Sequence, residues 1–175
     1  MATSKQQPVK TTTAEKTPTE NALPLKYEDI HFIDSVKSVW NYSLFADEDI
    51  VNFKNGTFYN GYQKFGSHQL NVLNTDGFYF AVWAPNATKV SVIGEFNGWK
   101  EQLHPLFVRL DKSGIWEGFI PNVKAGEIYK YYIKGFKGAI IKKTDPYGQY
   151  CELRPASASI TWQTQHDWKD AAWMK

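Results

Sequence analysis

The chain has 175 residues, a hydrophobic content of 42% and a net charge of +2, which allows one packed domain with a flanking segment. The small charge and the lack of a long basic run disfavour nucleic-acid binding, and no stretch approaches the roughly 20 apolar residues that cross a bilayer. The single cysteine, Cys151, excludes an intramolecular disulfide, and we expect it to be a small, semi-buried residue without a catalytic role. The polar N-terminus lacks a signal-like apolar stretch, so we expect a soluble, cytoplasmic protein, with a plastid location left open.

The first 75 residues divide into a polar tail and a segment that contains apolar side chains. Residues 1–22 are almost entirely polar, so burial cannot offset the entropy of ordering them, and we expect a disordered tail. In residues 23–75 we expect helical and extended structure. Apolar residues recur every three or four positions over 30–40, which indicates a short amphipathic helix. A second helix is expected over Asp47–Phe53, because an Asn-Gly pair follows it.

Residues 76–162 have the pattern of short strands separated by turn residues. Runs rich in aromatic and β-branched residues alternate with Gly, Pro and Asp, which is typical of a sandwich. We therefore predict a mainly β protein, an immunoglobulin-like β-sandwich preceded by a short helical segment and the disordered tail. Trp83 and Trp116 lie within predicted strands and are expected in the core, and residues 163–175 are expected to form a linker. The predicted strands cover residues 68–73, 78–83, 89–94, 115–120, 128–134, 139–142 and 158–162.

Three stretches of the β region carry distinctive motifs. The first, residues 80–99, contains Trp-Ala-Pro-Asn-Ala and Gly-Glu-Phe-Asn-Gly-Trp. The second, residues 114–131, contains Gly-Ile-Trp-Glu and Tyr-Lys-Tyr, and the third, residues 143–159, contains Asp-Pro-Tyr and Arg-Pro. Together they resemble the family 48 carbohydrate-binding module that precedes the catalytic domain in α-glucan branching enzymes of glycoside hydrolase family 13. The resemblance covers about residues 77–160 and implies a sandwich that binds α-1,4-glucan without a cofactor.

The segment upstream of the sandwich narrows the resemblance. Residues 44–68 are similar to the segment that precedes this module in branching enzymes. The similarity includes a Leu-Phe pair, an Asp-Ile pair and a Lys-Phe-Gly triplet. This similarity implies the N-terminal region of a 1,4-α-glucan (glycogen or starch) branching enzyme, a transferase that cuts α-1,4 chains and forms α-1,6 branches. The (β/α)₈ catalytic barrel of such an enzyme needs about 250 residues, which this chain does not contain, so we expect no activity from the chain alone.

No residue of the chain is assigned a catalytic role, because none matches the carboxylate motifs of that barrel. His68 and His104 lack the paired spacing of metal ligands, so we predict no metal and no cofactor. The carboxylic residues considered and set aside are Asp76, Glu95, Asp111, Glu117 and Asp145.

The candidate carbohydrate-binding residues are Trp99, Lys130, Asn97 and Tyr132. A protein binds a sugar by placing an aromatic plate on its apolar C–H face and polar groups at its hydroxyl rim. The resemblance implies that Trp99 stacks on glucose and that Lys130 meets sugar hydroxyls. Asn97 lies in the turn before Trp99, where it is expected to bond either a hydroxyl or its own backbone. Strand alternation places Tyr132 on the same face as Lys130.

The sequence leaves alternatives open for this site. The second aromatic plate of glycogen-binding members has no Trp or Tyr counterpart in residues 138–141. Trp99 could instead pack against a loop or against the catalytic domain. Trp162, Trp168 and Trp173 are expected to form a surface for that domain.

The expected partners are α-1,4-glucans (glycogen, starch and maltooligosaccharides) and the catalytic domain of the parent enzyme, with no nucleic acid and no membrane. Two other functions remain as alternatives. One is a free-standing glycogen-binding regulatory module, like the β subunits of AMP-activated kinases. The other is an immunoglobulin-like protein-interaction domain without sugar specificity.

Overall fold

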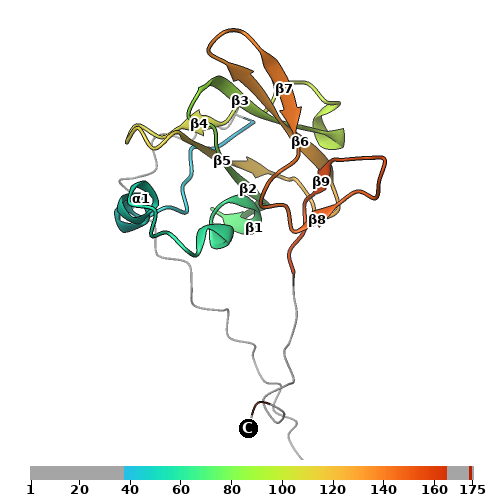
Figure 1. The fold of residues 1–175 in the computed structure, drawn as a ribbon. Helices are drawn as coiled ribbons and strands as arrows, with labels where there is room; N and C mark the ends of the chain where they lie inside the picture. The colour runs from blue at the N-terminus through green and yellow to red at the C-terminus, as the bar shows by residue number, and fades with distance from the viewer. Residues whose placement is uncertain (1–37, 165–173, 175) are drawn as a thin grey trace, which may run out of the picture.

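The computed structural model describes residues 38–164 and residue 174, in which two antiparallel sheets pack face to face (Figure 1). The strand order is β1-β2-β5-β4 in one sheet and β3-β6-β9-β8 in the other, where β7 also pairs with β6. Each predicted strand overlaps an observed one, which confirms the mainly β, immunoglobulin-like sandwich. The strands are β1 (Gly66–Val72), β2 (Thr75–Trp83), β3 (Ala87–Gly94), β4 (Phe107–Val108), β5 (Ile115–Pro121), β6 (Ile128–Gly135), β7 (Ile140–Lys143), β8 (Tyr150–Cys151) and β9 (Ser159–Ile160).

The predictions for the N-terminal region are tested only in part. The tail predicted over residues 1–22 lies outside the described residues, as does most of the helix predicted over 30–40. Near the other end of the chain, the same holds for Trp168 and Trp173. The described end of that predicted helix is extended: Trp40 exchanges two backbone hydrogen bonds with Phe119 of β5, at 2.7 and 3.0 Å. The second predicted helix is confirmed as α1 (Asp47–Lys54). No helix among the described residues is long and apolar enough to cross a membrane.

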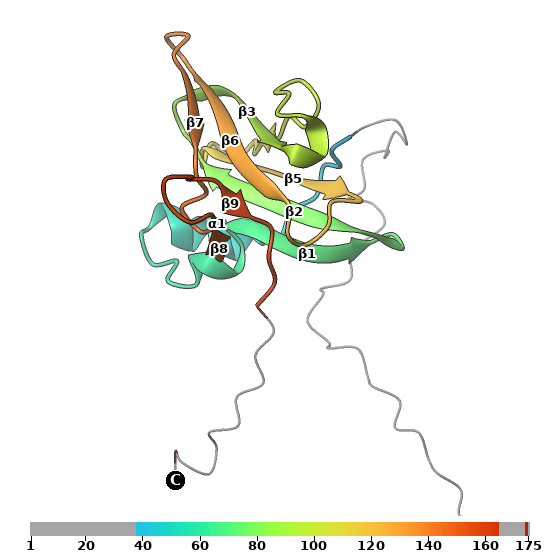
Figure 2. The same cartoon turned by 90° about the vertical axis from the view of Figure 1, so that its right-hand side faces the viewer.

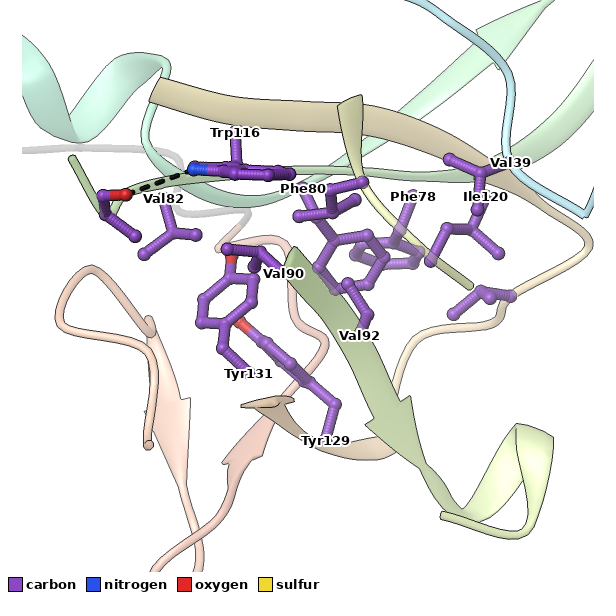
Figure 3. Close-up of a cluster of buried hydrophobic side chains, with 13 residues drawn as sticks. Val39, Phe78, Phe80, Val82, Val90, Val92, Trp116, Ile120, Tyr129 and Tyr131 are labelled. Carbon is purple, nitrogen blue, oxygen red and sulfur yellow. Dashed lines mark hydrogen bonds between the residues drawn. The ribbon is translucent and has the colours of Figure 1, made fainter. Parts of the chain in front are cut away.

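Side-chain alternation in the two sheets builds one core between them. Trp116 is buried there, as predicted, and its indole Nε1 donates a hydrogen bond to the carbonyl of Ala84 at 3.1 Å (Figure 3). Full burial of one such apolar side chain stabilises the fold by about 1.5–3 kcal/mol. The core includes Phe78, Phe80, Val82, Trp116 and Ile120 from one sheet and Val90, Val92, Tyr129 and Tyr131 from the other.

The outer face of the β1-β2-β5-β4 sheet is covered by the segment that precedes it in sequence. Phe45, Ile50 of α1 and Phe65 pack with Tyr79 and Phe119, which point away from the inter-sheet core. The rings of Phe45 and Phe65 meet edge to face with centroids 5.0 Å apart. A short 3₁₀ turn, η2 (Gly61–Gln63), leads from this layer into β1. The molecule therefore has three layers, and the N-terminal segment is one of them.

A buried carboxylate ties this N-terminal layer to the sheet. Glu117 of β5 accepts hydrogen bonds from the hydroxyl of Tyr79 at 2.5 Å, from Ser43 at 2.9 Å and from Arg109 at 2.7 Å. Burial raises the pKa of Glu117, and the hydrogen bonds from Tyr79 and Arg109 oppose that rise. Arg109 also pairs with Asp111 at 2.7 Å, so the connection from β4 to β5 belongs to the same network.

A second buried carboxylate holds the Asp-Pro-Tyr connector against β6. Asp145 accepts hydrogen bonds from the hydroxyls of Tyr129 at 2.6 Å and Tyr131 at 3.2 Å, and from the backbone N–H of Tyr147 at 2.8 Å. The backbone N–H of Asp145 donates to Ser159 at 3.0 Å. Burial raises the pKa of Asp145, and its hydrogen bonds act in the opposite direction.

Two predictions about burial are wrong. Trp83 is 56% exposed rather than in the core. It is the last residue of β2 on the face of the N-terminal layer, where Phe53 packs edge to face at 6.0 Å and the indole donates to the carbonyl of Ser113 at 3.0 Å. Cys151 is exposed rather than semi-buried, because β8 lies at the end of the strand order of its sheet.

The Asp145 network generates a stability prediction. The substitution Asp145→Asn replaces an acceptor oxygen with an amide that cannot accept the tyrosine hydroxyls, so we expect a loss of about 1–3 kcal/mol in unfolding free energy. The matched control is Asp76→Asn, because Asp76 is exposed and its carboxylate accepts one side-chain hydrogen bond, from Asn71. We expect that change to stay within about 0.5 kcal/mol. Urea unfolding of both variants at pH 7 makes the comparison, and equal losses would contradict the role assigned to Asp145.

Candidate functional site

Asn97 shapes the turn that follows β3. This turn contains a short 3₁₀ helix, η3 (Glu95–Asn97), and Asn97 is only 6% exposed. The side-chain oxygen of Asn97 accepts from the backbone N–H of Gly94 at 3.0 Å, and its amide donates to the carbonyl of Val92 at 2.9 Å. The same amide contacts Nδ1 of His104 at 2.7 Å. Both amide protons are thus used inside the protein, and none is left for a sugar hydroxyl.

His104 reaches the turn because the chain returns along the free edge of β3. The backbone N–H of Val92 donates to the carbonyl of His104 at 2.9 Å. The backbone N–H of Leu106 donates to the carbonyl of Val90, also at 2.9 Å. Burial lowers the pKa of His104 to about 4. The ring is therefore neutral at pH 7, so its Nδ1 accepts the hydrogen bond from Asn97.

The turn holds Trp99 at the surface in a constrained backbone conformation. Gly98 and Trp99 both have φ of 61°, and the backbone N–H of Trp99 donates to the carbonyl of Gly94 at 2.9 Å. A side chain other than glycine in this left-handed region costs roughly 1–2 kcal/mol. Gly94 allows the turn to close, since a Cβ there would lie 2.3 Å from the carbonyl oxygen of Ile128. Trp99 is 37% exposed as a residue, so a strained backbone presents it at the surface.

Lys130 lies on the outward face of β6, as strand alternation predicts, one residue from the position that pairs with the start of this turn. Lys130 pairs with Ile93 in the ladder, and its neighbour Tyr129 pairs with Gly94, which anchors Trp99. The Lys130 ammonium donates to the hydroxyl of Ser157 at 2.9 Å. Ser157 is exposed and comes from the loop between β8 and β9, so only the folded chain reveals it as a further polar group here.

Tyr132 shares the outward face with Lys130, but it is only 8% exposed. It lies on the central strand of three, with Ser91 of β3 on one side and Lys142 of β7 on the other. Because it is nearly buried between strands on both sides, Tyr132 supports the face and presents no open aromatic plate. An exposed aromatic missed by the sequence analysis is Phe136, which is 86% exposed in the turn between β6 and β7.

The described residues offer little for catalysis or metal binding. Among residues 38–164, no group of three His, Cys, Asp or Glu side chains is arranged to hold a metal ion. The two buried carboxylates, Glu117 and Asp145, are occupied by internal hydrogen bonds. The exposed Trp162 packs beside Tyr150, with ring centroids 5.5 Å apart. The exposed groups on this side of the molecule are the ring of Trp99 and the hydroxyl of Ser157, which accepts the hydrogen bond from Lys130.

Comparison with known proteins identifies a matching domain family and several similar relatives. Residues 64–148 match the family model described as carbohydrate-binding module 48 (isoamylase N-terminal domain). The 1,4-alpha-glucan branching enzyme GlgB of Aromatoleum aromaticum is 44% identical over 133 residues, covering 76% of this chain and 20% of the relative. The GlgB of Thermosynechococcus vestitus is 48% identical over 131 residues, covering 74% of this chain and 17% of the relative. The chain thus spans about a fifth of the length of the curated relatives it matches.

Solved structures give a more distant comparison. A pullulanase of Klebsiella pneumoniae complexed with maltotriose aligns with 57% of this chain and 10% of its own, at 23% identity and a TM-score of 0.47. A pullulanase of Anoxybacillus sp. LM18-11 aligns with 67% of this chain and 15% of its own, at 18% identity and a TM-score of 0.47.

The contact between Asn97 and His104 generates a prediction of pH dependence. His104 titrates near pH 6.5 in an unfolded chain and at about 4 in the fold, so between these values only the unfolded state binds the proton. The stability that this residue contributes is therefore complete above pH 6.5 and is lost as the pH falls toward 4. The variant His104→Asn keeps an acceptor for Asn97 and removes the titration.

The measurement is the urea midpoint of the original protein and of His104→Asn between pH 7 and pH 4.5. Asp145 and Glu117, whose raised pKa values act in the opposite sense, are present in both proteins, so the difference isolates His104. We expect the original protein to lose stability relative to the variant as the pH falls. A difference that stays constant with pH would show that His104 does not titrate as described.

Proposed function

We propose that this chain, whose residues 64–148 belong to the carbohydrate-binding module 48 family, holds α-1,4-glucan for a 1,4-α-glucan branching enzyme. The observation that carries the proposal is that Trp99 is exposed in the turn after β3, where its backbone is anchored to Gly94, the residue that pairs with the neighbour of Lys130. A flat ring fixed at the surface, with hydrogen-bond donors at its side, matches the two-sided chemistry of a glucose unit.

In this proposal each residue of the site has a separate role. The indole of Trp99 takes the C–H face of one glucose unit. Lys130 and Ser157, which already share a hydrogen bond of 2.9 Å, turn part of their hydrogen-bonding capacity to the sugar hydroxyls. Asn97 and Tyr132, both buried, act on the ligand only indirectly, through the shape of the turn and the support of the sheet face.

The expected affinity of a single site is low. Stacking one indole on one sugar ring removes apolar surface worth about 25 cal/mol per Å², which amounts to a few kcal/mol. Association costs at least about 4 kcal/mol in lost freedom, so little remains as net binding energy. We expect dissociation constants of about 0.1–1 mM for short maltooligosaccharides, or about −5.5 to −4.1 kcal/mol. A branched polymer binds more tightly, because its many equivalent ends raise the effective concentration.

In the whole protein, the module would anchor the glucan while a separate catalytic domain cuts an α-1,4 linkage and forms an α-1,6 branch, without a cofactor. The module alone is then inactive in branching. The exposed pair of Trp162 and Tyr150, on the side of β8 and β9, is a candidate for the surface that braces the catalytic domain. A cytoplasmic location is part of the same proposal.

The substitution Trp99→Ala tests the proposal most simply. It removes the aromatic plate at an exposed position, so we expect the dissociation constant for maltoheptaose to rise at least about tenfold, with the fold retained. The matched control is Trp83→Ala, because Trp83 is also an exposed tryptophan. It lies in β2, which belongs to a different sheet from β3, the strand that precedes the turn of Trp99. Calorimetric titration gives the affinities, and thermal melting reports the fold.

Three results are informative. Normal binding by Trp99→Ala would place the site elsewhere, and equal losses in both variants would show that the effect is not specific to Trp99. Unfolding of Trp99→Ala would show that this tryptophan is a packing residue. Each of these outcomes would overturn the assignment.

A further inference from the structure

Four lysines lie on the outward face of the three strands β3, β6 and β7. Strand pairing places Lys89 of β3 directly opposite Lys134 of β6, and Lys142 of β7 directly opposite Tyr132. Lys130 shares this face, because it lies two and four positions from Tyr132 and Lys134 in an alternating strand. The hairpin of β6 and β7, which carries three of these lysines, extends beyond the rest of the sandwich (Figure 2).

No acidic side chain of these strands offsets the lysines. Residues 87–94 and 128–143 contain six lysines and neither Asp nor Glu. The ion pairs found within residues 38–164 join Lys64 to Asp49 and Arg109 to Asp111 and Glu117, all away from this face. Like charges directly across an antiparallel pair are destabilising, so the opposition of Lys89 and Lys134 weakens the sheet. An anionic ligand would convert this repulsion into attraction.

The position of the lysines points to the kind of anion. The charged face is continuous with Lys130, and Lys130 adjoins the turn that presents Trp99. A ligand that reaches the lysines is therefore an extension of the ligand on Trp99. Lysine binds phosphate oxygens as a compact point charge that does not require a fixed geometry.

We propose that the outward face of β3, β6 and β7 binds phosphate monoesters carried by α-glucan chains, so that the module prefers phosphorylated over neutral glucan. This inference rests on the proposed function, because the neutral part of the chain is held at Trp99. Lys134 and Lys142, both exposed, bind the phosphate group, and Lys89 reinforces the positive potential beside Lys134.

The test compares maltoheptaose with maltoheptaose that carries one 6-phosphate, titrated calorimetrically at about 10 mM and about 300 mM salt. We expect the phosphorylated chain to bind about threefold to tenfold more tightly at low salt and less than about twofold more tightly at high salt. The double variant Lys134→Gln/Lys142→Gln should lose this preference and keep its affinity for neutral maltoheptaose.

The matched control is Lys112→Gln/Lys124→Gln, which removes the same charge from exposed loops elsewhere and should keep the preference. No preference in the original protein, or equal loss in both double variants, would overturn the inference. Polyglutamate, tested in parallel, distinguishes an acidic protein partner: lysine-dependent binding of that peptide without any preference for the phosphorylated glucan would also overturn it. Failure of neutral maltoheptaose to bind would instead contradict the proposed function.

Discussion

The buried carboxylate of Asp145 determines which face β6 turns to the solvent. It accepts hydrogen bonds from the hydroxyls of Tyr129 and Tyr131, so these alternate residues must point into the core. Lys130 and Lys134 must then point outward, because successive side chains of a strand lie on opposite faces. A register slip of one residue would bury the lysines and leave two tyrosine hydroxyls without their hydrogen-bond acceptor. This register is therefore strongly specified.

The surface that we assign to glucan depends on that register. β6 pairs with β3 on one side, and Tyr129 lies opposite Gly94, the residue whose carbonyl anchors Trp99. The hydrogen bonds of Asn97 then close the turn, and the backbone strain at Trp99 is offset by the buried contacts around it. The proposed binding surface is thus a consequence of how the core fixes one strand.

Much of this arrangement could be predicted from the sequence, because alternation and turn residues are local signals. The seven predicted strands, helix α1 and the outward direction of Lys130 follow from them, whereas the two-residue strands β4 and β8 were not predicted. The misjudged residues depend on distant neighbours. Periodicity assigns Trp83 to a face of the sheet, but it does not show that the N-terminal layer covers this residue only through Phe53. Tyr132 is buried because strands flank it on both sides.

The candidate site could be predicted less completely for the same reason. The residue types of the turn before Trp99 are visible in the sequence, but the partner that uses the second amide proton of Asn97, His104, lies seven positions later. Ser157 meets Lys130 only after the chain has passed through β7 and β8. Both contacts come from tertiary structure, which no local pattern encodes.

The most direct test of the central claim, that Trp99 is the ring that meets the glucan, is a chemical-shift titration of the ¹⁵N-labelled chain with maltoheptaose. We expect the largest changes at the indole N–H of Trp99 and at the backbone amides of the turn and of Lys130. The indoles of Trp83 and Trp116 should stay unchanged. Largest changes at Trp83 or Trp162, with Trp99 unaffected, would show that the glucan meets another part of the surface.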